Sequence, residues 1–327
     1  MKRSLPPLPG VLAALLLAGC PASAGTLVQF RTPLGTLEVE LFDQEKPLTV
    51  ANFKRYAESG VWTNMFLHRL IPGFVAQGGG FRVTDPGTTN VWFDAVPDFP
   101  QVPNEFSVGP RRPNVFGTIA MAKIPPYTNT VVTPPQTNVV GGVTNVVAGQ
   151  TNQIVSGGPD SASREWFFNL GDNSDNLDDQ NGGFTVFGQV VGPSTNVLHL
   201  LNTFTAAPVQ LTNRLYNLGG TGFPFDSRPN PGAFPLLRAV STFDQIFTNA
   251  LFVDVRLLAV DVTPRTGDGQ DLRWEPVSGG TNVVEFTRVF PPQWQVLTNL
   301  VRPAGTTATA TDPAPDPARF YRVRIAY

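Results

Sequence analysis

The sequence predicts a mainly β protein, a barrel or sandwich with helical caps, and three observations support this. Gly and Pro account for 31 and 32 of the 327 residues, together well above the usual ~12%. Charged residues make up 15%, against ~25% in an average domain, which argues against long helices and coiled coils. Short segments alternate at period two, as Leu37, Val39 and Leu41 do around Glu38 and Glu40. Many strands with few helices favour a barrel or a sandwich.

The expected elements follow from local patterns. Residues 47–60 are expected to form a helix, because Val50, Phe53 and Ala57 share one face and Gly60 suits a C-cap. A second helix is expected over 194–204. Strands are expected over 27–31, 36–42, 65–69, 73–77, 117–122, 165–170, 185–190 and 251–260.

The composition also limits the classes of function. The net charge of −2 argues against a nucleic-acid partner, which requires a basic face. With 41% hydrophobic residues, including 24 Phe, the chain can bury a core. One cysteine excludes an intramolecular disulfide framework, and two histidines argue against a metal site. We therefore expect no metal.

Residues 1–24 have the features of an export signal. Positive charge at positions 2–3 precedes an apolar run over 11–18 that is too short to span a bilayer as a mature helix. Two cleavage sites compete: residues 22–24 form an A-x-A site, while residues 17–20 resemble a bacterial lipobox that would lipidate Cys20. Either site predicts export to the periplasm or cell envelope, lipid-anchored at Cys20 or otherwise secreted. The lipid would be the only membrane attachment.

Two stretches read as insertions. The first, about 124–159, contains no Lys, Arg, Asp or Glu over 125–159 and repeats Thr-Asn four times. It could be a disordered polar tract or a β-ribbon, since Thr and Val favour strands. We favour a surface excursion with part β-hairpin character. The second, about 206–248, is rich in Gly, Pro and Phe, and its apolar content predicts packing on the body.

The sequence pattern changes after Val262, where the expected barrel strands end. Residues 263–271 read as a linker, and 272–327 as a small all-β module of unassigned role. Its aromatic residues Trp274, Trp294, Phe320 and Tyr321 could supply a compact core.

Residues 66–79, FLHRLIPGFVAQGG, resemble the signature of cyclophilins, the cyclophilin-type peptidyl-prolyl cis–trans isomerases. Further pieces follow in family order over 117–122, 160–170 and 176–188. The resemblance covers about 26–262, with both excursions as insertions. It implies an eight-stranded antiparallel β-barrel capped by two helices.

The resemblance also implies the site residues. Arg69 occupies the position of the catalytic arginine, and Gln77 would orient it and hydrogen-bond the substrate backbone. The residues matching the family's substrate-binding surface are Phe74, Val75, Ala122, Glu165, Phe167, Leu177 and Phe184. His68 reads as structural, because this reaction needs no general base.

The chemistry needs neither cofactor nor covalent intermediate. An X-Pro bond rotates slowly because amide resonance sets a barrier of ~20 kcal/mol. Twisting the amide returns a lone pair to the prolyl nitrogen. A guanidinium that donates to this nitrogen stabilises the transition state over the ground state.

Three residues depart from the family pattern. Glu165 stands where most relatives have Gln, Lys123 where Asn is usual, and Asn176 where Trp or Phe is common. A carboxylate at 165 could orient Arg69 or partly neutralise its field. The sequence thus predicts a monomeric, exported prolyl isomerase acting on proline-containing segments of exported or unfolded proteins. The alternative is a non-catalytic proline-peptide binding or scaffold protein of the cell envelope.

Overall fold

The computed structural model describes residues 25–140, 143–206, 214–216, 234–238, 244–258, 260–265, 269–274, 276, 281–289, 293–301, 307–313 and 319–326. The predicted signal over 1–24, with Cys20, lies outside the described residues. Across the described ranges, no helix combines the length and the hydropathy needed to span a membrane.

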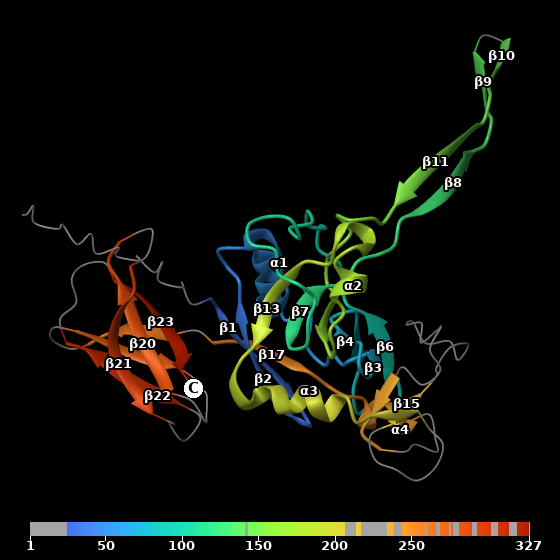
Figure 1. Cartoon of the computed structure of the whole chain (residues 1–327). Coiled ribbons are helices and arrows are strands. Elements are labelled where there is room, and N and C mark those ends of the chain that lie inside the picture. The colour runs from blue at the N-terminus through green and yellow to red at the C-terminus, as the bar shows by residue number, and fades with distance from the viewer. Residues whose placement is uncertain are drawn as a thin grey trace, which may run out of the picture.

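One eight-stranded sheet forms the body, in the order β17-β1-β2-β13-β7-β12-β4-β3, with every neighbouring pair antiparallel. Backbone bonds from Leu67 to Leu251 and from Val253 to Met65, both 2.9 Å, join the segments that precede the two edge strands. The sheet therefore curls into a barrel, which confirms the predicted fold class (Figure 1). Its strands are β1 (Leu27–Thr32), β2 (Gly35–Leu41), β3 (Arg69–Ile71), β4 (Val75–Gly78), β7 (Thr118–Met121), β12 (Trp166–Asn169), β13 (Val186–Val190) and β17 (Asp254–Leu257).

Two helices cap this barrel. Helix α1 (Pro47–Ser59) ends at Gly60, whose φ of 75° suits a left-handed C-cap. Helix α3 (Thr195–Leu201) follows a 3-10 turn, η2 (Gly192–Ser194). Both bury apolar faces in the interior core, where the ring of Phe30 meets Trp166 edge-on with centroids 4.9 Å apart.

A buried ion system fixes the start of α1. The Glu105 carboxylate accepts the N–H groups of Leu48 and Thr49 at 3.1 and 2.7 Å. The Lys46 ammonium, 1% exposed, donates to the carbonyls of Glu105 and Val108 at 2.8 and 2.5 Å. A carboxylate at a helix N-terminus stabilises both the free N–H groups and the helix dipole. The loop through Glu105 is thereby tied to the barrel.

Two strand predictions need correction. The strand predicted over 65–69 begins only at Arg69, because the residues before it make isolated bridges: Met65 bridges to Arg82 on β5 (Phe81–Thr84), and Phe66 bridges to Phe252 beside the other barrel edge. The strand predicted over 251–260 is divided between β17 and β18 (Val260–Pro264), because the chain leaves the barrel there to pair with β19.

The first insertion forms a ribbon that projects from the body (Figure 1). Strand β8 (Tyr127–Thr133) pairs with β11 (Gln150–Ser156), and β9 (Gln136–Val140) pairs with β10 (Val143–Val147), both antiparallel. The predicted β-hairpin character is confirmed.

Much of the second insertion lies outside the described residues. Its described elements are β14 (Thr205–Ala206), β15 (Arg214–Tyr216), β16 (Phe234–Leu236) and α4 (Asp244–Asn249). Side chains of β16 and α4 pack with the hairpin of β5 (Phe81–Thr84) and β6 (Trp92–Ala95) in a separate apolar cluster. This part of the insertion packs on the body, as predicted.

The C-terminal residues form two three-stranded antiparallel sheets. Their strands are β18, β19 (Gln270–Trp274), β20 (Thr281–Thr287), β21 (Gln295–Val301), β22 (Ala308–Asp312) and β23 (Phe320–Ala326). Residues 263–271, predicted as a linker, carry the end of β18 and the start of β19, and 266–268 lie outside the described residues. Trp274 is buried at 3% exposure, whereas Phe320, expected in the core, is 60% exposed. The next residue, Tyr321, packs against the core, and successive side chains of a strand point to opposite faces, so Phe320 points outward.

Candidate active site

The site lies on the outer face of four neighbouring strands, β4, β12, β7 and β13. These strands are buried on both faces, so alternate side chains serve two cores. In β12, Trp166 and Phe168 point into the barrel, whereas Phe167 joins a second cluster outside it. The same alternation places Ala76 inside and Val75 outside. The barrel thus presents an apolar surface on its exterior.

Strand register arranges this surface around a single row. Arg69 on β3 pairs with Gln77 on β4, and Gln77 pairs with Phe167 on β12. Phe167 pairs in turn with Ala120 on β7, which pairs with Val186 on β13. Directly paired residues point to the same face of a sheet. These five paired residues, called the row below, begin with the Arg69 cation, continue through the Gln77 amide and end in the apolar side chains of Phe167, Ala120 and Val186, called the floor.

The predicted pocket residues meet at this floor. Val75, Phe167 and Leu177 are buried in the outer cluster, with Phe74, Ala122 and Phe184 partly buried against them. The rings of Phe167 and Phe184 meet edge-on at 5.8 Å between centroids. Sequence reasoning missed Ala120, Val186 and Phe42, which belong to the same cluster. The alternation within 118–121 was the available signal for Ala120.

The polar end of the row is a chain of contacts. The Arg69 guanidinium donates through Nη1 to Gln77 Oε1 at 3.2 Å and lies 5.7 Å from the centroid of the Phe74 ring. Gln77 Nε2 donates to Glu165 Oε2 at 2.6 Å. His68 Nε2 lies 3.5 Å from the same oxygen. In the described part of the chain, Arg69 and Glu165 are thus linked through Gln77 rather than by a direct ion pair.

Burial and charge set the protonation of this end. Burial lowers the pKa of the Arg69 guanidinium, and the Glu165 charge opposes that shift. Burial raises the pKa of the Glu165 carboxyl, but His68, the Gln77 amide and Arg164 outweigh it and hold the pKa below its usual value. Arginine stays protonated in proteins, so the site holds a cation facing an apolar pocket.

A glycine run makes room for the carboxylate. A Cβ at Gly80 would lie 2.4 Å from Glu165 Oε1, and Gly79 has a φ of 87°. Both positions therefore favour glycine.

Behind the pocket lies a network of asparagines that the sequence did not reveal. Asn173 donates to the Phe74 carbonyl at 2.8 Å and to Asn169 Oδ1 at 2.7 Å. Asn169 donates to Asn114 Oδ1 at 3.2 Å, and Asn114 donates to the Phe184 carbonyl at 3.0 Å. The network ties the backbones of two pocket walls together. Asn173 lies beside α2 (Ser174–Leu177), so it also fixes the helix that carries Leu177.

Lys123 supports the remaining wall. Its ammonium donates to the carbonyls of Asn181 and Gly183 around η1 (Gln180–Gly182), and lies 5.3 Å from the centroid of the Phe184 ring. Burial lowers the pKa of Lys123 to about 8, with Asp160 opposing. Its charge holds the loop that positions Phe184.

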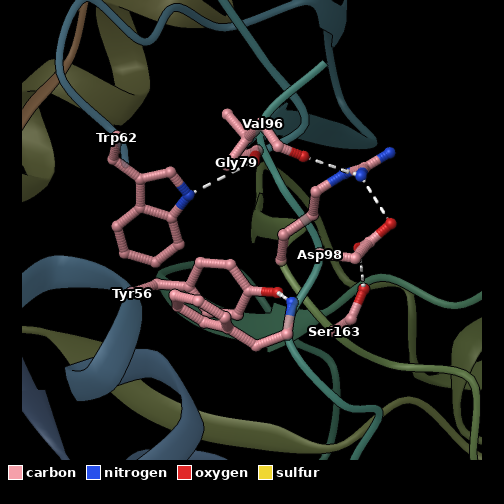
Figure 2. Close-up of polar contacts among 8 residues, drawn as sticks. Tyr56, Trp62, Gly79, Val96, Asp98 and Ser163 are labelled. Atoms are coloured by element: carbon pink, nitrogen blue, oxygen red, sulfur yellow. Dashed lines mark hydrogen bonds and ion pairs between the residues drawn. The ribbon is translucent and has the colours of Figure 1, made fainter. Parts of the chain in front are cut away.

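A polar cleft of about 220 Å³ adjoins the row, lined by Gln77, Ala122, Lys123 and Glu165 among others. Three other lining residues, Asp98, Ser163 and Arg164, hold one another in place, and Figure 2 shows Asp98 beside Ser163. Asp98 accepts Ser163 Oγ at 2.8 Å and Arg164 Nη1 at 2.6 Å, and the same Arg164 nitrogen donates to the Val96 carbonyl at 2.7 Å. The apolar cluster can therefore contact an apolar ring while the adjoining cleft receives polar backbone.

The site therefore defines a protein that places a guanidinium, held by Gln77, beside an apolar cluster on the exterior of a barrel. Comparison with known proteins identifies the family. The model for cyclophilin type peptidyl-prolyl cis-trans isomerase/CLD matches residues 27–132. Peptidyl-prolyl cis-trans isomerase of Acinetobacter baylyi is 30% identical over 182 residues, covering 55% of this chain and 74% of that protein. Peptidyl-prolyl cis-trans isomerase A of Dickeya dadantii is 33% identical over 173 residues, covering 52% of this chain and 68% of that protein.

The chain belongs to the cyclophilin-type peptidyl-prolyl cis–trans isomerase family, as these two relatives show. Among solved structures, cyclophilin AquaCyp293 from Hirschia baltica is similar at 14% identity and a TM-score of 0.37, covering 76% of this chain and 78% of that one.

Proposed function

We propose that this chain accelerates rotation about X-Pro bonds in exported or unfolding proteins. The observation that carries the proposal is the row in which Gln77 holds Arg69 beside the apolar pocket around Phe167. The apolar cluster offers a surface against which a proline ring can pack, and the guanidinium beside it can donate to the prolyl nitrogen as the amide twists. This hydrogen bond strengthens only when the nitrogen regains its lone pair, so it favours the transition state.

The remaining groups prepare this geometry. Gln77 holds Arg69 through its oxygen, and Glu165 holds Gln77 through its nitrogen. The asparagine network fixes the Phe74 and Phe184 backbones. Because no bond to the substrate forms or breaks, positioning and electrostatics supply the whole acceleration.

The signal-like residues 1–24 support export of the mature chain, anchored through Cys20 or released after cleavage at 22–24. We propose that the chain works as a monomer on proline-containing segments in the periplasm or cell envelope. Mass spectrometry of the mature N-terminus distinguishes the two processing routes.

The decisive experiment measures isomerisation of the peptide Ala-Ala-Pro-Phe by exchange NMR. Wild-type protein should accelerate it, and Arg69→Ala should lower kcat/KM at least tenfold. The matched control is Arg256→Ala, whose side chain is 56% exposed on β17 and should leave the rate unchanged. No acceleration by folded wild-type protein would contradict the proposal.

A second candidate function is binding of proline segments without turnover, and one observation favours it. The negative charge of Glu165 acts on the Arg69 guanidinium, which could weaken it as a donor. A peptide-binding titration beside the same assay separates the two: tight binding without acceleration would identify a scaffold.

A further inference from the structure

The ribbon of residues 127–156, called the arm below, is exposed on its faces and edges where the structure describes its side chains. All seven residues of β8 are exposed, as are six of the seven in β11. Val132 and Val155 lie on one face and are 65% and 71% exposed. An isolated two-stranded ribbon is marginally stable in water, so a third strand would stabilise this one.

The two strands at the base of the arm, β8 and β11, contain neither a charged residue nor a proline, although prolines flank β8 at 125–126 and 134–135. Exposed edge strands are normally blocked by charged side chains, by proline or by cover from another element. The chain carries no Lys, Arg, Asp or Glu over 125–159. In an antiparallel pair, each strand turns the backbone groups of alternate residues away from its partner. Both β8 and β11 can therefore accept an added strand, with no preference for the charge of its side chains.

Both legs of the arm begin at the cleft beside Gln77. Ala122 and Ile124, on the outgoing leg, line that cleft, and Ser161 lines it on the returning leg. The legs are fastened together at this point: Gly158 N–H donates to the Ile124 carbonyl at 2.9 Å, and Ile124 N–H donates to Ser161 Oγ at 2.9 Å. A chain bound along this cleft therefore lies beside the base of the arm.

We infer that the arm binds the extended polypeptide flanking the target proline and adds it as a third strand along β8 or β11. The inference rests on the proposed function, because the proline must occupy the pocket. Steric contact with the proline ring holds the preceding residue extended, so the flank of an X-Pro bond is already close to strand geometry. Strand addition gives affinity through main-chain hydrogen bonds, which suits clients of varied sequence. Seven residues of β8 present an edge about 24 Å long.

The test compares two peptides that share one proline. The short peptide is Ala-Ala-Pro-Phe, and the long one carries the same residues with eight uncharged Thr, Val and Ser residues on each side. In the armless variant, Asn-Gly replaces residues 128–155 and joins Tyr127 to Ser156, which are paired neighbours that a two-residue hairpin turn can connect.

We expect wild-type and armless proteins to isomerise the short peptide equally, whereas the armless variant loses about tenfold in kcat/KM on the long peptide, through KM. The matched control is a displaced-arm variant, in which the tripeptide Gly-Ser-Gly is inserted twice, once between residues 126 and 127 and once between residues 156 and 157. It keeps the arm strands but separates them from the cleft, and should show the same loss. Amide hydrogen exchange in β8 or β11 should slow when the long peptide binds to wild-type protein.

Equal activity of wild-type and armless proteins on both peptides would overturn the inference. A second result would also overturn it. If analytical ultracentrifugation shows that wild-type protein is a dimer and the armless variant a monomer, and both have the same activity on the long peptide, the arm binds a second copy of the chain. If wild-type protein fails on the short peptide, the proposed isomerase function falls, and anisotropy titrations with the two peptides still test the arm. Wild-type protein should then bind the long peptide about tenfold more tightly than the armless variant does, and equal affinities would refute client binding.

Discussion

Replacing Glu165 by Gln distinguishes two effects that a carboxylate near Arg69 could have. In the structure, Glu165 accepts from Gln77 Nε2 at 2.6 Å, and Gln77 Oε1 accepts from Arg69 at 3.2 Å. Because a carboxylate only accepts, it forces the Gln77 amide to turn its nitrogen inward and its oxygen toward Arg69. A glutamine at 165 could pair with either orientation of that amide.

The magnitudes predict opposite signs for the two effects. Charge-assisted hydrogen bonds exceed neutral ones by about 1 kcal/mol, so weaker orientation should lower kcat/KM about fivefold. Through the amide the two charges lie at most about 8 Å apart, which at an effective dielectric constant of about 20 is an attraction of about 2 kcal/mol. The prolyl nitrogen carries no full charge, so only a small part of that field acts on the transition state. We expect orientation to dominate and Glu165→Gln to be slower.

The assay is exchange NMR on Ala-Ala-Pro-Phe at pH 7, with Asp179→Asn as an exposed carboxylate control. A rise in kcat/KM for Glu165→Gln would refute the orientation argument and support neutralisation. A double-mutant cycle of Gln77→Ala and Glu165→Gln gives a second test, because the effects of two residues on kcat/KM do not add when one residue acts through the other. In a Gln77→Ala background, Glu165→Gln should change kcat/KM less than twofold.

Three further predictions concern the supports of the site. Because the pKa of Lys123 is lowered to about 8 in the folded protein but is about 10.4 in an unfolded chain, the unfolded state binds more protons between these values. The free energy of unfolding should therefore rise from pH 8 to 10 in urea titrations, and this rise should be absent in Lys123→Met. Glu105→Gln should lower that free energy at pH 7 by about 2 kcal/mol, because it replaces a carboxylate that accepts two N–H groups at the start of α1 and removes the negative charge that most favours the buried Lys46 ammonium. Glu45→Gln, which breaks a partly exposed ion pair with Arg112, should cost under about 1 kcal/mol. Asn173→Ala should raise KM for the short peptide about fivefold by freeing the Phe74 carbonyl, whereas exposed Asn176→Ala should leave it unchanged; equal KM values would show that the network does not position the pocket.

Local patterns predicted much of the barrel. The alternation over 37–41 and the helix signals over 47–60 gave elements that agree with the structure to within about two residues, a usual margin for strand and helix ends. The motif over 66–79 predicted Arg69, Gln77, Phe74 and Val75 as site residues, because family positions in one short segment need no knowledge of register, and the structure brings these four residues together. The uncharged repeat over 125–159 indicated a ribbon, although its pairing could not be deduced.

Features that depend on long-range register could not be predicted. Asn114 and Asn173 lie 59 positions apart in the sequence and meet behind the pocket through Asn169. Asparagine in a loop normally indicates a turn, so nothing local marks such residues as buried. The cap on α1 is similar, because Glu105 belongs to a loop that only tertiary packing brings to Thr49.

The residues proposed to isomerise the prolyl bond and those proposed to bind its flanks lie in separate parts of the chain, so the sequence of one part can change without the other. Isomerisation depends on placing Arg69 and the apolar cluster with little freedom, and strands supply that rigidity because Gln77, Phe167 and Ala120 each pair with a residue on either side, while Arg69 on the edge strand is held by Gln77. The arm, by contrast, lies between β7 and β12 in the sequence, outside the paired residues of both strands, so its length and sequence can change without altering the register of the row. A chain built this way can change which flanking sequences it binds while the chemistry at the prolyl bond stays the same. Under this reasoning, the armless variant should match wild type on the short peptide in kcat and KM separately. Any loss in kcat would mean that the arm also holds the row in place.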